Sequence, residues 1–189
     1  MSVEEYQAKL KRLVVNRRGG RASPHKICML LAVIDMAKAG ALPENQIRYG
    51  PPLLERYGDF FNSDRSPGDH SNPYFPFFHL GGRLAGREAG FLHLRALPGR
   101  EAVVEAMSTA RSPSDITRNI DYAELDTPLF KLLHEAAARD ALADTISTHW
   151  LDRGWRLRAG KTAPLSRTVL TPHGRGFVIA RGGAAPCSQ

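Results

Sequence analysis

The 189 residues include only two cysteines, Cys28 and Cys187, and these stand far apart in the chain. So sparse a supply excludes a disulfide framework, and no CxxC pair typical of a zinc site is present. Cys28 lies in the apolar run of residues 27–34, where we expect it to be a core residue. Cys187 lies in a C-terminal segment rich in Gly, Ala and Pro.

The chain also lacks a long apolar run. No stretch approaches the roughly 20 residues that a membrane-spanning helix needs. Residues 1–11 are charged and amphipathic, which is unlike a signal peptide. From the sequence we expect a cytoplasmic protein that does not bind a membrane.

Catalytic signatures are equally scarce. The sequence has no HExxH motif and no two adjacent histidines, and HNH-type nucleases need paired His and Asn or Asp residues. Asp64, Asp69 and His70 are close in sequence, but no Glu-x-Lys strand follows them. We therefore expect no catalytic residue, no metal and no cofactor. A metal-dependent endonuclease with an unrecognised site remains an alternative, and Mg²⁺- or Mn²⁺-dependent DNA cleavage abolished by His70→Ala would support it.

Positive charge is abundant. The chain has 26 Lys and Arg against 19 Asp and Glu, a net charge of +7. Such a balance favours a polyanionic partner, because each phosphate neutralised by Lys or Arg releases counterions. Nucleic acid is the expected partner. A generic double-stranded DNA-binding domain, or a protein-interaction domain, is a further alternative.

Apolar periodicity predicts the first helices. Residues 2–16 have the spacing of an amphipathic helix, and residues 16–21 form a flexible connector that carries Arg17, Arg18 and Arg21. Ser23 is predicted to cap a buried helix that has Pro24 at its first position and ends at Gly40. Another helix is predicted to begin at Pro51 or Pro52.

The second half of the chain predicts a small sheet and more helices. Residues 75–80 are predicted to be extended, because Pro76 is unsuited to a helix interior. Residues 91–97 alternate as a strand does, 101–109 form a short helix, and Thr127-Pro128 opens a pair of helices. The expected fold class is α+β, mainly α, a helical bundle with a small antiparallel β-sheet. We expect one domain over residues 1–160 and a basic, Gly/Pro-rich tail or linker over 161–189.

Two motifs stand out as candidate binding elements. Ser23-Pro24-His25-Lys26 would place His25 and Lys26 at a helix N-terminus, where free amides and the helix dipole favour a phosphate. Residues 72–80, which we call the aromatic–proline element, have four aromatic residues and two prolines in nine positions. That is more apolar bulk than one buried face needs, so we expect half of them in the core and half along a surface.

These two motifs resemble the sulfur-binding domain of phosphorothioation-dependent, McrA-like type IV restriction endonucleases. The resemblance covers roughly residues 5–152 and rests on residues 23–35, on residues 74–80, on the strand at 89–94, and on residues 123–142, which match the family's later helices. Lys26 stands where some relatives have arginine, and Phe78 where some have tryptophan. The HNH nuclease domain of these endonucleases has no counterpart in this sequence.

The resemblance implies binding of double-stranded DNA in which sulfur replaces a non-bridging phosphate oxygen. It assigns an apolar sulfur cavity to Tyr74, Phe75, Pro76 and His79, and the phosphate to His25 and Lys26. Pro73, which precedes them in the sequence, is a further candidate for contact with the DNA. Arg17, Arg18 and Arg21 would attract the DNA backbone without sequence preference. Our candidates for reading bases beside the sulfur are Ser108, Thr109, Arg111 and Ser112. A homodimer and a nuclease domain in cis are the partner arrangements left open.

Overall fold

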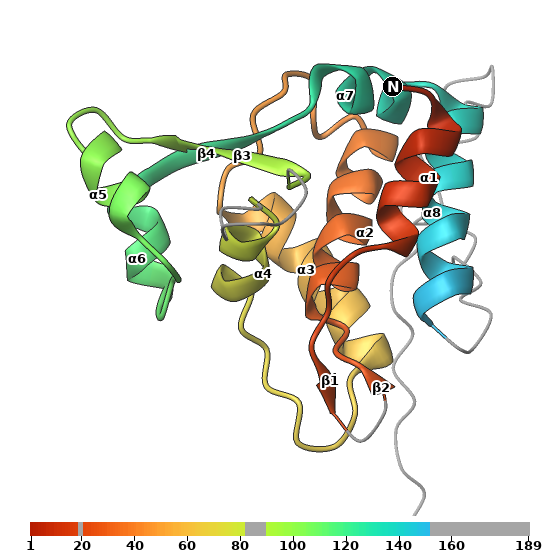
Figure 1. Cartoon of the computed structure of the whole chain (residues 1–189), viewed down its shortest axis with the longest axis horizontal. Coiled ribbons are helices and arrows are strands. Elements are labelled where there is room, and N and C mark those ends of the chain that lie inside the picture. The colour runs from red at the N-terminus through yellow and green to blue at the C-terminus, as the bar shows by residue number, and fades with distance from the viewer. Residues whose placement is uncertain (19–20, 82–89, 152–189) are drawn as a thin grey trace, which may run out of the picture. The chain divides into compact units, whose positions relative to one another are not determined.

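The computed structural model describes residues 1–18, 21–81 and 90–151, apart from the side chains of Arg18 and Arg21. All of these residues belong to one compact unit, Met1–Arg156 (Figure 1). The predicted boundary at residue 160, the predicted tail and Cys187 lie outside the described residues. In chain order the elements are α1 (Val3–Lys11), β1 (Arg17–Arg18), β2 (Arg21–Ala22), α2 (His25–Lys38), α3 (Pro51–Asp64), α4 (Tyr74–His79), β3 (Leu92–Ala96), α5 (Glu101–Ala106), α6 (Pro113–Thr117), β4 (Ile120–Leu125), α7 (Thr127–His134) and α8 (Ala136–Trp150).

Helix α2 is the centre of the bundle. It contacts α3, α4, α7 and α8, and ten of its fourteen residues are buried, as the apolar run predicts. Gly40 follows the helix with a φ of +69°, a conformation that favours glycine after a helix end. The start differs from the prediction by one residue. Pro24 occupies the capping position, and the Ser23 hydroxyl bonds to the His25 ring instead of capping the helix.

Helix α1 is shorter than the predicted residues 2–16. Ser2 and Glu5 form a capping box at its N-terminus, in which each side chain bonds the backbone amide of the other residue. The helix ends at Lys11, five residues early. Val14 and Val15 follow, and their β-branched side chains favour extended backbone over helix. The chain then enters β1.

A short hairpin replaces the predicted flexible connector. Strands β1 and β2 pair antiparallel, with Arg17 opposite Ala22 and Arg18 opposite Arg21. A backbone hydrogen bond of 2.7 Å from the Ser23 amide to the Asn16 carbonyl extends this pairing. The prediction of an unpaired segment was wrong, because Gly-Gly between two short strands is itself a hairpin signal.

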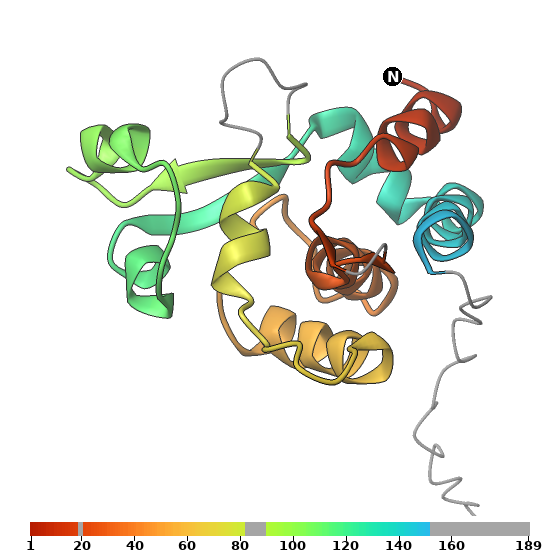
Figure 2. The same cartoon turned by 60° about the horizontal axis from the view of Figure 1, so that its bottom comes forward.

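The aromatic–proline element is helical, so the prediction of an extended segment was wrong. Helix α4 begins at Tyr74, which places Pro76 at its third position. The first amides of a helix have no intrahelical acceptor, so a proline there forfeits no hydrogen bond. The amide of Phe77 bonds the Pro73 carbonyl, and that of Leu80 bonds the Pro76 carbonyl. Figure 2 shows α4 between the α2–α3 pair and the β3–β4 sheet.

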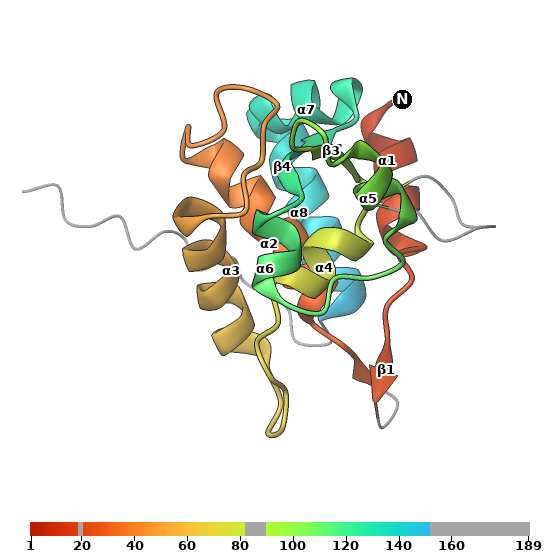
Figure 3. The same ribbon diagram turned by 90° about the vertical axis from the view of Figure 1, so that its left-hand side faces the viewer.

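Strands β3 and β4 form the small antiparallel sheet. Leu92 pairs with Leu125 and Leu94 with Ala123, and a register irregularity follows at Arg95–Ala96. The predicted strand at 91–97 is confirmed as β3. Strand β4 was not predicted, and the match of residues 123–126 to later helices was wrong, because the chain is extended through Leu125. Helices α5 and α6 contact β3 and β4 respectively, and α6 also lies against α4 (Figure 3).

The last two helices complete the bundle. Helices α7 and α8 pack on each other and on α2, and α8 also packs along α1. The expected class, mainly helical α+β with a small antiparallel sheet, is confirmed. Among residues 1–18, 21–81 and 90–151, no helix combines the length and the apolar character that crossing a bilayer requires.

A polar cluster joins α1 to the sheet. The Asp126 carboxylate, directly after β4, accepts hydrogen bonds from His93 Nε2 at 2.6 Å and from the Tyr6 hydroxyl at 3.2 Å. Lys9 Nζ lies 3.5 Å from the same carboxylate, donates to the Gly90 carbonyl and sits over the Phe91 ring. We call Tyr6, Lys9, His93 and Asp126 the Asp126 cluster. It anchors the helix whose C-terminal continuation leads into the β1–β2 hairpin.

The Asp126 cluster predicts acid sensitivity. Partial burial alone would raise the pKa of Asp126, but the hydrogen bond from His93 and the charge of Lys9 outweigh it and lower that pKa below the ordinary value. A carboxyl group with a depressed folded-state pKa stabilises the fold above its unfolded pKa, which is about 3.9, and loses that contribution as the pH falls through the folded pKa. We expect urea unfolding to show stability falling from pH 5 to pH 3.

Asp126→Asn is expected to flatten this dependence, because the amide does not titrate. Asp140→Asn serves as the matched control, since Asp140 is 61% exposed and its nearest Arg139 nitrogen is 3.9 Å away. An unchanged pH profile in Asp126→Asn would show that other carboxylates cause the acid sensitivity.

Candidate nucleic-acid interface

A cavity of about 390 Å³ lies where the two motifs converge. Helix α2 contributes His25 and Lys26 from its first turn, and α4 contributes Phe75 and His79. The remaining described lining residues come from the flanking segments: Val15, Asn16, Ser23 and Asn72. Among the described residues that line the cavity none is acidic, so the wall combines apolar surface with positive charge and polar groups.

Phe75 and His79 form the aromatic wall. They are four residues apart, so a helix places them on one face, and their ring centroids lie 4.2 Å apart. Phe77 and Phe78 point to the core instead and are buried. The expected division of this element between core and surface is therefore seen, with helical rather than extended spacing.

His79 also connects the cavity to a distant loop. Its Nε2 atom lies 3.1 Å from the Thr109 hydroxyl, and Phe78 contacts the imidazole edge-on at 5.4 Å. Thr109 lies between α5 and α6, in the segment predicted to read bases. The hydrogen bond between Thr109 and His79 therefore connects the predicted base-reading segment to the cavity wall.

His25 and Lys26 both have backbone partners. The His25 ring bonds the Ser23 hydroxyl through Nδ1 at 2.7 Å and the His70 carbonyl through Nε2 at 2.9 Å. Lys26 Nζ donates to the Val14 carbonyl at 2.8 Å.

The aromatic–proline element holds three further candidates, and none of them belongs to the described lining of the cavity. Pro76 is buried, and Pro73 and Tyr74 are half-buried without belonging to the described lining. The Tyr74 hydroxyl lies 3.4 Å from the Asn72 amide oxygen, so Tyr74 supports a lining residue. Of the cavity residues that the resemblance assigns, Phe75 and His79 line this cavity.

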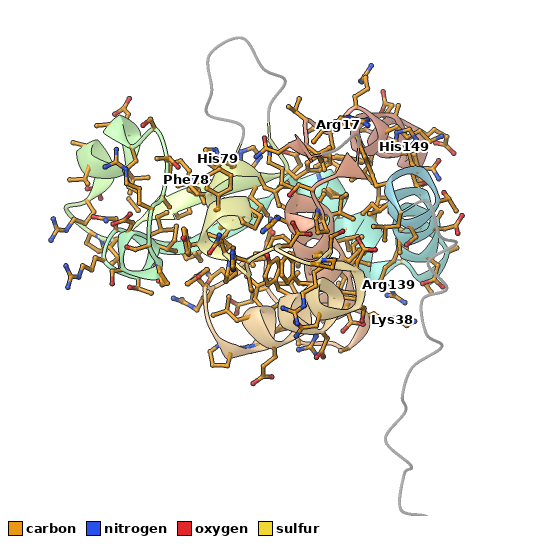
Figure 4. All side chains as sticks on the ribbon, turned by 90° about the horizontal axis from the view of Figure 1, so that it is seen from below. Arg17, Lys38, Phe78, His79, Arg139 and His149 are labelled. Carbon is orange, nitrogen blue, oxygen red and sulfur yellow. The ribbon has the colours of Figure 1, made fainter. Side chains whose placement is uncertain are left out.

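The remaining candidates are spread around it. Arg17 is exposed on the hairpin, and Arg18 and Arg21 share that hairpin, though their side chains lie outside the described set. Figure 4 shows Arg17 and His79 towards one side of the unit, and Lys38 and Arg139 towards the other. Ser108 and Arg111 are exposed, while Ser112 caps α6 by accepting from the Asp115 amide.

Four lining residues were not named as site residues: Val15, Asn16, Ser23 and Asn72, although Ser23 and Asn72 belong to the two candidate motifs. Asn16 and Ser23 flank the hairpin, so a Gly-Gly hairpin signal would have brought them together. Asn72 precedes α4, and no sequence pattern indicates that it faces α2.

Two further findings bear on identity. Within the described part of the chain, no three His, Cys, Asp or Glu side chains are grouped to hold a metal ion. No protein-family model matches the chain, and no curated protein matches it.

Proposed function

We propose that this chain is a DNA-binding module that recognises phosphorothioate-modified double-stranded DNA, the targeting part of a modification-dependent restriction system. One observation carries the proposal. Two motifs that are far apart in the sequence, one with His25 and Lys26 and the other with Phe75 and His79, line one cavity. These are the motifs on which the resemblance to sulfur-binding domains rests.

The chemistry of the cavity suits such a ligand. Sulfur is larger, more polarisable and more weakly hydrated than oxygen, so an apolar wall such as Phe75 is better matched to sulfur. An ordinary phosphate oxygen would lose hydration there without an equivalent hydrogen bond. Lys26, which lines the cavity, supplies charge for the rest of the phosphate. Arg17 on the hairpin and the overall charge of +7 favour the DNA backbone irrespective of sulfur.

The proposal predicts two separable contributions to affinity. Matched duplexes with and without one phosphorothioate would be titrated by fluorescence anisotropy at 50 and 200 mM salt. Both affinities should fall steeply with salt, because counterion release depends on charge. The ratio of the two affinities should be the same at both salt concentrations, about tenfold or more in favour of the phosphorothioate duplex. The reason is that discrimination depends on desolvation at one atom.

Two outcomes would contradict the proposal. Equal affinity for the two duplexes at both salt concentrations would leave a generic double-stranded DNA-binding domain. Metal-dependent cleavage of modified DNA by the purified chain would assign it the alternative, nuclease, function.

A further inference from the structure

His25 uses both ring nitrogens inside the protein. The His70 carbonyl can only accept, so His25 Nε2 carries the proton of the 2.9 Å bond between them. In the neutral ring Nδ1 is then an acceptor, and the Ser23 hydroxyl, 2.7 Å away, donates to it. This pattern leaves the neutral imidazole no further site for hydrogen bonding to a phosphate.

The ring joins three parts of the cavity wall. His25 belongs to the first turn of α2, Ser23 follows the hairpin, and His70 lies in the loop between α3 and α4. The imidazole also packs on the buried Phe61 of α3, with ring centroids 4.9 Å apart, which limits its rotation. A single side chain therefore connects the hairpin end, α2 and the α3–α4 loop.

That loop carries a lining residue. Asn72 stands two residues after His70 and faces the cavity. The Ser66 amide donates to the Asp69 carboxylate at 2.8 Å and the Asp69 amide to the Ser66 carbonyl, which closes a local turn. The bond from His25 Nε2 to the His70 carbonyl ties this loop to the first turn of α2.

We propose that His25 is a positioning residue for the cavity. It holds the α3–α4 loop, and with it Asn72, against the N-terminus of α2, and acts on the bound phosphate through that loop and not by direct contact. This inference rests on the proposed function and gives His25 a role different from the phosphate contact that the resemblance implies.

Two substitutions separate positioning from direct contact. His25→Gln keeps a side-chain N–H for the His70 carbonyl and an oxygen that accepts from Ser23. His25→Phe keeps an aromatic ring against Phe61 and removes both hydrogen bonds. His134→Phe is the matched control, because the two His134 ring nitrogens also lie within hydrogen-bond distance of protein groups, the Phe130 and Leu42 carbonyls, and a neutral ring donates to one of the two. The His134 ring also packs on Phe130, yet His134 is not among the described lining residues of the cavity.

Two readouts are needed, both on the full chain. Hydrogen exchange of the Ser66 and Asp69 amides in the DNA-free protein reports whether the loop is held. Anisotropy titration with the phosphorothioate duplex reports binding. In His25→Phe we expect exchange about tenfold faster and affinity about tenfold weaker, a change of about 1.4 kcal/mol that lies within the range for loss of one hydrogen bond. In His25→Gln both should return to within about threefold of the wild type, and His134→Phe should change neither.

The results that overturn the inference are distinct. Unchanged loop exchange in His25→Phe would show that His25 does not hold the loop. A His25→Gln variant with a protected loop but the weak binding of His25→Phe would show that the imidazole acts on the DNA itself. If the wild type does not distinguish the two duplexes, the proposed function fails, while the exchange rates still decide whether His25 positions the loop.

Discussion

Replacing Phe75 with alanine is expected to remove most of the preference for phosphorothioate DNA while leaving the fold intact. Phe75 is the half-buried aromatic residue of the cavity wall, and its ring packs on His79 at 4.2 Å. Truncation opens the wall to water, so sulfur loses its apolar contact. An apolar pocket discriminates single groups by about 1–3 kcal/mol, so the affinity ratio between the modified and ordinary duplexes should fall by about tenfold or more.

The chain offers a matched control for this variant. Phe130 on α7 is also half-buried and packs on a histidine four residues later, His134, at 4.5 Å, but it does not line the cavity. Phe130→Ala should keep the affinity ratio of the wild type. Tyr74→Ala should have a smaller effect than Phe75→Ala, because Tyr74 acts through Asn72. A larger loss in Tyr74→Ala would mean that the sulfur lies on the other side of α4.

Replacing Phe77 with alanine is expected to give the opposite result, a large loss of stability. Phe77 is 0% exposed and contacts Tyr49 edge-on with centroids 5.3 Å apart. Buried Phe→Ala substitutions cost about 3–5 kcal/mol, since they remove apolar contacts and leave a cavity. Urea unfolding at pH 7 measures the change in the free energy of unfolding.

The comparison of Phe77 with Phe75 tests the conformation of the aromatic–proline element. In an extended segment these residues would share one face, and both alanine variants would lose similar stability. In helix α4 they point in different directions, so Phe75→Ala should cost much less. Equal losses in the two variants would contradict the helix.

The sequence predicted which elements are buried better than it predicted which elements pack against each other. The run of apolar residues in α2 and the glycine that ends it are local signals, and local signals define a helix that is buried on most sides. The prediction of an extended segment at Pro76 was wrong because the effect of a proline on a helix depends on its distance from the helix start. The presence of a proline does not by itself reveal where the helix starts. Strand β4 was not predicted because Asp121 and Glu124 interrupt its apolar residues and because its pairing with β3 is non-local.

In the candidate site, too, local features could be predicted from the sequence and non-local packing could not. The Pro-His-Lys turn indicated His25 and Lys26, and the resemblance assigned Phe75 and His79; all four line the cavity. Their convergence depends on α4 packing against α2, which no spacing in the sequence expresses. The Asp126 cluster was missed for a related reason, since Tyr6 and Asp126 meet only through the packing of α1 near the end of β4.

The most direct test of the account is a comparison of two complexes by NMR. Amide chemical shifts of the chain, 20.8 kDa in mass, would be recorded with the phosphorothioate duplex and with the ordinary duplex of the same sequence. If the sulfur occupies the cavity, shift differences between the complexes should concentrate at Lys26, Asn72, Phe75 and His79, with smaller differences on the hairpin. Superimposable spectra, or differences confined to residues away from this cavity, would contradict a sulfur site between α2 and α4.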